Sequence, residues 1–190
     1  IIFITDQNNT TGADQVTGAT WNGIACTLIK YANEAGLSNG NHVFGCLPGA
    51  DTGTFNAVMN SAAADIRRMQ VTSYTGVNQS LTMDSTPGAW GSGVANHTQS
   101  ITTVADNSWL FMMGTVGGAA VTAGAGTTFR ANSAGDYTVS DSGGAKSPAG
   151  AYDLVWTYAA SAAGAAYFSF APAVAAVVAP DQSSDLIIFE

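Results

Sequence analysis

Two short motifs contain the residue types of this 190-residue chain that are best suited to catalysis. Asp51-Thr52-Gly53 matches the triplet of aspartic proteases, where two carboxylates share one proton and activate a water molecule. That chemistry needs a second triplet or a symmetric dimer, and the sequence contains no second copy. The triplet also follows Pro48-Gly49-Ala50 rather than an apolar strand, so we interpret it as part of a turn.

The second motif, Ser140-Asp141-Ser142-Gly143-Gly144, is similar to the sequence around a serine-protease nucleophile. With His97 and Asp106, Ser142 would supply the residue types of a Ser-His-Asp triad. However, the residues around His97 (ANHTQS) do not match the context of a catalytic histidine, and triads are recognised by geometry rather than by order. We interpret the motif as a surface loop, and we predict no catalytic residue and no enzyme activity.

The sequence also predicts no metal or cofactor site. His42 and His97 have no neighbouring cluster of Asp, Glu or Cys, so ordinary hydrogen-bonded histidines are expected. Asp136, Asp141 and Asp153 could meet at one end of a β-sandwich and bind Ca²⁺ through oxygen atoms. Their spacing is not that of a calcium-binding loop, so we do not predict a calcium site.

The composition narrows the class of protein. Apolar residues make up 46% of the chain and charged residues 9%, which is typical of extracellular or virion β proteins rather than cytosolic enzymes. The formal net charge is −8, and the few basic residues form no cluster that could follow a phosphate backbone. We therefore expect neither nucleic acid nor an anionic membrane as a partner.

The element that organises these motifs is Val16–Tyr31, which is predicted to form two strands joined by Asn22-Gly23. Asn-Gly accepts positive φ at both central positions of a tight hairpin turn. Pairing about this turn predicts one mainly apolar, buried face, made of these opposed pairs: Trp21 with Ile24, Ala19 with Cys26, and Thr17 with Leu28.

Alternating apolar and polar residues predict many further strands. Ser108–Val116 is apolar on both faces, so it is predicted to be a central strand, paired with Gln99–Val104 about a turn at Ala105–Asn107. Tyr152–Tyr158 alternates cleanly, with one apolar face. Gly76–Asn96 is predicted to be a long loop, in which Trp90 either caps the core or forms a contact surface.

These patterns predict an all-β fold: an antiparallel β-sandwich of jelly-roll type, with about ten or more strands in two paired sheets. Cys26 and Cys46 lie symmetrically about Gly36, so an antiparallel ladder across that connection would place them opposite each other. A cross-strand disulfide or two free buried thiols would both fit, and two free thiols are the simpler interpretation.

The chain is predicted to have three parts. Residues 1–15 form an N-terminal strand and loop, residues 16–172 form the sandwich, and residues 173–190 form an apolar tail. IIF occurs near both ends, so the terminal segments could pair with each other or serve as arms that add strands to a neighbouring subunit. No apolar run reaches the ~20 residues of a membrane span, and because Ile1 is not an initiator methionine we expect a trimmed or longer parent chain.

Several segments resemble a jelly-roll-like module that recurs in bacteriophage structural proteins and in bacterial secreted or surface proteins. The resemblance covers roughly Val16–Pro172 and rests on VTGATWNGIACTL, on FGCLP followed by GTF, and on VTSYTGV. Cys26, Cys46, the long Gly76–Asn96 segment and the apolar tail depart from the pattern.

The resemblance implies a structural protein of a phage virion, either a capsid decoration protein or a tail or fibre component, that acts through protein–protein contacts. It implies other virion proteins and further copies of the chain as partners, and no enzyme. The alternative is a carbohydrate-binding or adhesive module on a bacterial surface, with host-surface glycan stacked on Trp90, Tyr137 and Tyr152. The residues predicted to contact partners are Ile1, Ile2, Phe3, Trp90, Leu186, Ile187, Ile188 and Phe189.

Overall fold

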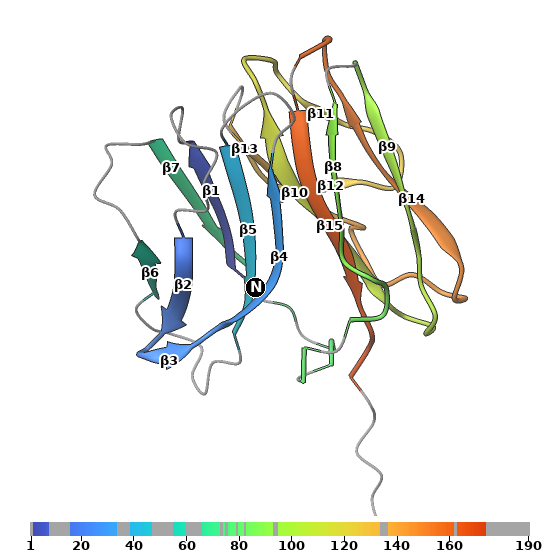
Figure 1. The fold of residues 1–190 in the computed structure, drawn as a ribbon. Coiled ribbons are helices and arrows are strands. Elements are labelled where there is room, and N and C mark those ends of the chain that lie inside the picture. Colours follow the sequence, from blue (N-terminus) through green and yellow to red (C-terminus); the bar gives the residue numbers. More distant parts are fainter. Residues whose placement is uncertain are drawn as a thin grey trace, which may run out of the picture.

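The structure is a computed structural model, and it describes residues 2–7, 16–33, 39–46, 55–59, 66–72, 74, 76–78, 80–81, 83–92, 95–133, 137–161 and 163–173. Within these residues there are fifteen strands and no helix, and all strand pairs are antiparallel (Figure 1). The prediction of an all-β antiparallel sandwich with ten or more strands is confirmed.

The strands form four sheets, which we number as layers in the order in which they stack (Figure 1). Layer 1 has the strand order β3 (Ile24–Ala25), β2 (Val16–Trp21), β6 (Phe55–Met59). Layer 2 has the order β4 (Thr27–Asn33), β5 (Asn39–Gly45), β1 (Ile2–Gln7), β7 (Ile66–Val71).

Layers 3 and 4 contain the strands from the second half of the chain. Layer 3 has the order β12 (Thr128–Ser133), β13 (Tyr137–Asp141), β10 (Trp109–Val116), β15 (Ala163–Phe170), β8 (Gly88–Ser92). Layer 4 has the order β11 (Thr122–Ala123), β14 (Ala151–Thr157), β9 (His97–Thr102). The predicted number of two paired sheets is therefore wrong, because the described strands form a stack of four sheets.

Three hydrophobic cores lie between the successive layers. Among the residues whose burial is described, the core between layers 1 and 2 contains Val16, Ala19 and Phe44. The core between layers 2 and 3 is rich in aromatic side chains, including Phe111 and Phe168. The third core lies between layers 3 and 4, and the two inner layers are consequently covered on both faces.

Strand β10 explains why layer 3 is an inner layer. Phe111 and Met113 point into the core between layers 2 and 3, whereas Leu110 and Met112 point into the core between layers 3 and 4. All four side chains are fully buried, as expected for a strand that is apolar on both faces. The prediction of a central strand here is confirmed, since β10 pairs with β13 and β15.

Strand β14 follows the predicted alternation. Leu154 and Trp156 are fully buried and Tyr158 is 5% exposed, whereas Asp153 and Thr157 face the solvent. Period-two alternation is typical of a sheet with one covered face, and layer 4 is such a sheet because it lies at the outside of the stack.

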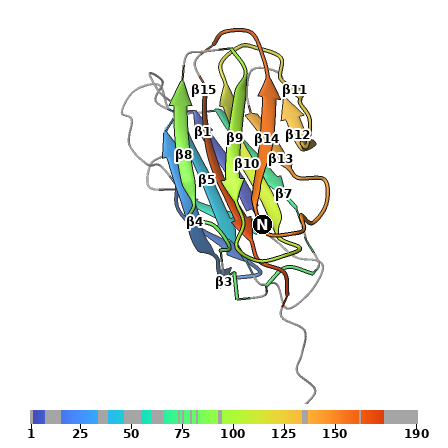
Figure 2. The ribbon, with the colours of Figure 1, turned by 90° about the vertical axis from the view of Figure 1, so that its right-hand side faces the viewer.

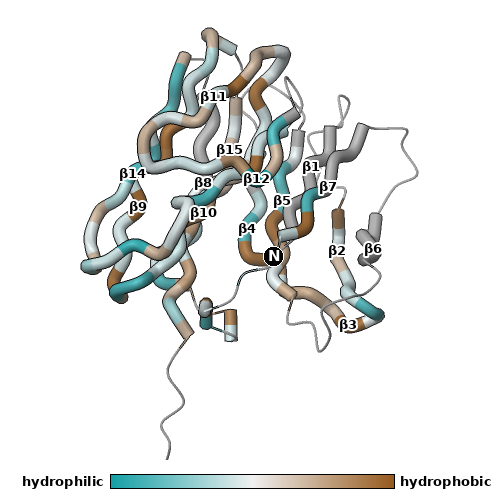
Figure 3. Tube along the Cα trace, turned by 180° about the vertical axis from the view of Figure 1, so that it is seen from behind, coloured by the Kyte–Doolittle hydropathy of each residue, from teal (hydrophilic) through white to brown (hydrophobic). Residues whose placement is uncertain are grey.

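The predicted hairpin around Asn22-Gly23 is confirmed as far as Ala19 and Cys26, where the Cys26 N–H donates to the Ala19 carbonyl at 2.9 Å, and it is wrong beyond them. Asn22 and Gly23 have φ values of 50° and 79°, and Trp21 pairs with Ile24. Beyond Cys26 the chain enters β4, which pairs with β5 of layer 2, so Leu28 lies opposite Phe44 and not opposite Thr17. The predicted buried face is formed only in part, since Ile24 is 59% exposed and Leu28 is 46% exposed, and Figure 3 shows hydrophobic residues near β3 at the outside of the molecule.

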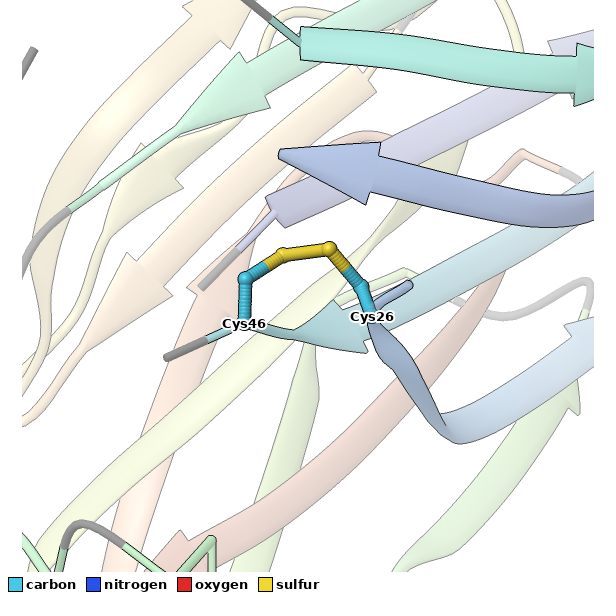
Figure 4. The surroundings of a disulfide bond; sticks show 2 residues. All are labelled: Cys26 and Cys46. Atoms are coloured by element: carbon cyan, nitrogen blue, oxygen red, sulfur yellow. A yellow bond between two sulfur atoms is a disulfide. The ribbon is translucent and has the colours of Figure 1, made fainter. Parts of the chain in front are cut away.

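A disulfide bond joins Cys26 and Cys46, so the interpretation as two free thiols is wrong (Figure 4). Thr27 pairs with Gly45 at the end of the β4–β5 ladder, which places the next residue on each side opposite the other. The predicted symmetry about Gly36 thus holds at this end of the ladder. The bond fixes the point where the chain passes from layer 1 into layer 2.

Two predicted connections differ from the structure. Residues 97–102 do not pair with β10, because β9 belongs to layer 4 and β10 to layer 3, and the turn between them crosses from one sheet to the other. The segment Gly76–Asn96 is not a loop throughout, since residues 88–92 form strand β8 beside β15. Alternation along one strand does not identify its neighbour, so neither pairing could be read from the local pattern.

The N-terminal strand lies inside layer 2. Strand β1 pairs with β5 on one side and with β7 on the other, so both of its edges are used within the chain. The structure therefore places Ile2–Gln7 in the sandwich rather than in an arm, and it does not pair this segment with the C-terminal residues as the sequence suggested. The tail beyond Ala173 lies outside the described residues.

Candidate functional site

The strongest cluster of charged and polar side chains surrounds Asp141, at the end of β13. Arg130 reaches this carboxylate from the edge strand β12, where the register shifts between Phe129 and Ala131. Arg130 has no opposite residue in that ladder, so it is the extra residue of a β-bulge. Tyr74 approaches from the segment that leaves β7 of layer 2. Three separate parts of the chain meet at one carboxylate.

Each oxygen of the Asp141 carboxylate accepts two hydrogen bonds. The Arg130 guanidinium donates from Nε to Oδ2 at 2.5 Å and from Nη2 to Oδ1 at 3.0 Å. The Tyr74 hydroxyl donates to Oδ2 at 2.8 Å, and the Gly143 N–H donates to Oδ1 at 2.8 Å. A carboxylate offers about four lone-pair positions, so these donors occupy them all.

The electrostatics of the cluster favour charged Arg130 and neutral Tyr74. Burial raises the pKa of the Tyr74 hydroxyl, and the negative charge of Asp141 raises it further. The hydrogen bond to Asp141 raises the pKa of Arg130 above its ordinary value. Asp141 is fully buried while the Arg130 side chain is 35% exposed. The cluster is therefore a partly buried, bidentate ion pair with a tyrosine hydroxyl bound to it.

Aromatic rings extend the cluster into the core between layers 2 and 3. The Tyr74 ring lies edge-on to Phe111, with ring centroids 4.8 Å apart, and to Trp109 at 5.4 Å. Phe111 in turn stacks on Phe168 at 5.1 Å. Such offset and edge-to-face contacts stabilise beyond simple burial. The Asp141 cluster thus links β12 and β13 of layer 3 to the segment that follows β7 of layer 2.

A second carboxylate, that of Asp84, organises the turn between β9 and β10. Its oxygens accept hydrogen bonds from the N–H groups of Val104 and Ala105, both at 2.8 Å, and from the Ser108 hydroxyl at 2.9 Å. The Asp84 N–H itself donates to the carbonyl of Ser169 on β15 at 2.9 Å. Asp84 therefore fixes the crossover from layer 4 to layer 3.

The three residues considered for a serine triad are not brought together. The Ser142 hydroxyl donates to the Gly144 carbonyl at 2.7 Å and accepts from the Leu110 N–H at 3.2 Å. His97 begins β9, whereas Asp106 lies beyond its other end and accepts a hydrogen bond from the Ala149 N–H at 2.6 Å. At about 3.3 Å per residue, the length of β9 alone separates the two ends by about 16 Å.

The remaining catalytic and metal candidates are placed as follows. Asp51 and Asp136 lie outside the described residues. Asp153 is exposed on the outer face of β14, away from the buried Asp141. In the part of the chain that the structure describes, no three His, Cys, Asp or Glu side chains are grouped so that they could hold a metal ion.

The two histidines have different surroundings. His42 is fully buried on β5, and its ring lies between Tyr31, at a centroid distance of 4.8 Å, and Phe44, at 6.3 Å. His97 is partly buried and lies 3.3 Å from the Gln99 side-chain oxygen. Burial lowers the pKa of His97, which favours its neutral form.

The predicted partner contacts can be placed only in part. Ile2 and Phe3 lie on β1, whose backbone pairs on both sides. Trp90 lies on β8 opposite Ala165, so it belongs to a strand rather than to a loop. Ile1 and the tail residues fall outside the described part of the chain, namely Leu186, Ile187, Ile188 and Phe189.

The aromatic row proposed for a carbohydrate site is not formed. Tyr137 packs against the core between layers 2 and 3, whereas Tyr152 packs against the core between layers 3 and 4. The Tyr152 hydroxyl also donates to the Pro148 carbonyl at 2.5 Å. The two rings lie on opposite faces of layer 3, so they cannot stack side by side on one glycan.

Sequence reasoning did not identify Asp84, Arg130 or Tyr74 as organising residues. Arg130 had a usable signal, because it is one charge in a strand whose neighbours Phe129 and Ala131 are apolar. Asp84 and Tyr74 act on residues at least 20 positions away, and no local pattern reports such a contact.

Within the described residues, no helix has the length and apolar character needed to cross a bilayer.

The comparisons with known proteins give no relative for this architecture. No protein-family model, no curated protein and no solved structure matches the chain.

Proposed function

We propose that this chain is a structural protein of a phage virion, a capsid decoration protein or a tail or fibre component, that works through protein–protein contacts. The proposal rests on one observation: the side chains best suited to catalysis are bound to other groups of the scaffold. Asp141 and Arg130 bind each other, Asp84 holds a backbone turn, and the Ser142 hydroxyl is bound to Gly144 and Leu110. These groups stabilise a rigid scaffold, and a rigid scaffold is what a contact protein needs.

Two further features support a location outside the cytosol. The Cys26–Cys46 disulfide belongs to the class of bonds that persist in oxidising surroundings, such as virion and cell surfaces. The low charged fraction of 9% agrees with the composition of such proteins. The resemblance of Val16–Pro172 to a jelly-roll-like phage module makes the virion the preferred location.

The deciding experiment locates the chain in particles. Phage particles from the source of this sequence would be purified, and an antibody raised against the chain would be applied in immunogold electron microscopy. We expect regular labelling of the capsid or tail, and its absence from purified particles would contradict the proposal. A chain without residues 186–190 tests the predicted tail contact: it should fold normally but occupy fewer positions on the particle.

A further inference from the structure

The chain contains two Asn-Gly pairs, and the structure places them in very different surroundings. Asn22-Gly23 is the turn between β2 and β3, whereas Asn39-Gly40 begins strand β5. In such a pair the backbone nitrogen of the glycine can attack the side-chain carbonyl carbon of the asparagine, because glycine has no Cβ that would block the approach. The dipeptide sequence alone would make both pairs equally reactive.

The first pair lies at the surface. Asn22 and Gly23 are both exposed, with φ values of 50° and 79°, and a Cβ added at Gly23 would meet no atom within 4 Å. Figures 1 and 2 place β3 with β2 in an outer layer of the stack, at the end away from layers 3 and 4. Water can therefore reach the peptide group between Asn22 and Gly23, and the glycine leaves room for the asparagine side chain to approach it.

Few contacts hold this turn closed. Strand β3 consists of Ile24 and Ala25, which are both exposed, and among the described strands it pairs only with β2. Its ladder with β2 contains two residue pairs. Segments with few buried contacts open locally at a lower free energy than the whole protein. The turn can therefore open, and bring the Asn22 side chain over the Gly23 nitrogen, while the cores stay folded.

The second pair is held on both sides. Gly40 is buried in β5, and it pairs with Asp6 of β1 and with Asn33 of β4. A Cβ added at Gly40 would lie 3.0 Å from the Tyr31 ring and 3.1 Å from the His42 ring, so the space beside this residue is already filled. Moving the backbone here would break two ladders of layer 2, so this pair can react only after a much larger opening.

We propose that Asn22 is a site of spontaneous backbone modification, at which the folded protein converts asparagine to aspartate and isoaspartate. The Gly23 nitrogen forms a bond with Cγ of Asn22 and gives up its proton to water. The Cγ–Nδ2 bond breaks, and the side-chain nitrogen takes up a proton and leaves as ammonia. Water then opens the resulting cyclic imide at either carbonyl. The net reaction consumes one water molecule, releases one ammonia molecule and needs no oxidant, metal or enzyme.

The product changes the turn in two ways. A carboxylate replaces a neutral amide, and in isoaspartate the main chain runs through the side-chain carbons, which lengthens it by one methylene group. A two-residue hairpin turn depends on a defined backbone geometry, so the ladder between β2 and β3 should open. The change should stop at Cys26, because its N–H donates to the Ala19 carbonyl at 2.9 Å and its sulfur is bonded to Cys46.

The test follows both Asn-Gly pairs in the full purified protein during incubation at pH 8, in water labelled with heavy oxygen. Peptide mapping by mass spectrometry measures conversion at each pair, and uptake of the label shows that it occurred during the incubation. Asn22 should convert more than about tenfold faster than Asn39, because a local opening costs less free energy than breaking two ladders. In urea, where the chain is unfolded, the two pairs should convert at similar rates. A folded protein in which Asn22 converts no faster than Asn39, or not at all, would overturn the proposal.

Asn22→Gly is the matched variant for the structural consequence, because Gly-Gly also accepts positive φ at both turn positions but carries no side-chain amide. After incubation the natural sequence should contain isoaspartate, detected with a protein isoaspartyl methyltransferase, and hydrogen exchange should become faster in β3. The incubated variant should show neither change. Faster exchange that also appears in the variant, or that extends to β10, would contradict the assignment to Asn22.

Discussion

Two tryptophans show how differently the two ends of the layer stack are stabilised. Trp156, on β14, is fully buried and its indole N–H donates to the Ser140 hydroxyl at 2.9 Å. Trp21, at the end of β2, is partly exposed, and its indole N–H has no hydrogen-bond partner among the described residues. The first belongs to a core whose described buried residues include many large side chains, whereas the described buried residues around the second are Val16, Ala19 and Phe44.

The covalent link occurs at the same end of the stack as Trp21. The Cys26–Cys46 bond lies beside the core between layers 1 and 2, and both cysteines pack against the described buried residues of that core. The cores on either side of layer 3 have no such link among the described residues and depend on packing.

The largest expected effect comes from removing the better-buried tryptophan. Trp156→Ala should lower the free energy of unfolding by about 3–5 kcal/mol, because it opens a cavity and leaves the Ser140 hydroxyl without its donor. Trp21→Ala is the matched control and should cost about 1–2 kcal/mol, since less apolar area is buried there. Urea titration followed by circular dichroism measures both, and equal losses would mean that the two ends are equally well packed.

The second-largest loss of stability is expected when the Cys26–Cys46 disulfide is removed. The double variant Cys26→Ser with Cys46→Ser removes a link between positions 20 residues apart, which should cost about 3 kcal/mol by the chain-entropy relation. The loss should be local, because no β10 side chain is among the described residues of the core between layers 1 and 2. Hydrogen exchange should show faster exchange in β2 and β4 but not in β10. Uniform acceleration across all layers would show instead that the stack unfolds as one unit.

The sequence was most informative where a strand's own side chains decide its environment. The strand Trp109–Val116 is apolar at every position from Leu110 to Met113, and only an inner layer can cover both faces. The alternation in Tyr152–Tyr158 likewise identified which face is buried. In both cases the evidence is local, since a side chain's direction follows from its position along the strand.

The sequence was least informative where distant segments meet. The chain leaves the hairpin after Cys26 and pairs with β5, and because β5 lies outside Val16–Tyr31, the local pattern could not predict this ladder. The Asp141 cluster depends on Tyr74, which is 67 residues away, and on Arg130, which lies at a bulge of β12. Symmetry about Gly36 correctly placed the cysteines opposite each other, but residue types alone left the bond undecided.

A smaller and pH-dependent effect is expected at Tyr74. Its pKa is raised in the folded protein from an ordinary value of 10.0, chiefly by burial. A group with a raised pKa contributes its stabilisation fully below its unfolded pKa and loses it as the pH rises above that value. The free energy of unfolding should therefore fall above pH 10.

Tyr74→Phe tests this assignment. It should cost about 1–2 kcal/mol at pH 8, because the Asp141 carboxylate loses a buried donor, and it should flatten the fall above pH 10. Urea midpoints measured from pH 8 to pH 11 give both quantities. Tyr152→Phe, which removes an exposed hydrogen bond to Pro148, is the control and should change the midpoint less. An unchanged pH profile in Tyr74→Phe would contradict the proposed role of the buried hydroxyl.

The smallest change in stability is expected in the hairpin around Asn22-Gly23. Ile24→Ser should change the free energy of unfolding by no more than about 0.5 kcal/mol, because the side chain is 59% exposed. Ala19→Ser, on the same hairpin but 3% exposed, should cost about 1–3 kcal/mol by burying a hydroxyl against Phe44. If the predicted face were buried throughout, Ile24 and Ala19 would lie on it together and both changes would be costly. The difference between these two variants therefore measures how much of that face the rest of the protein covers.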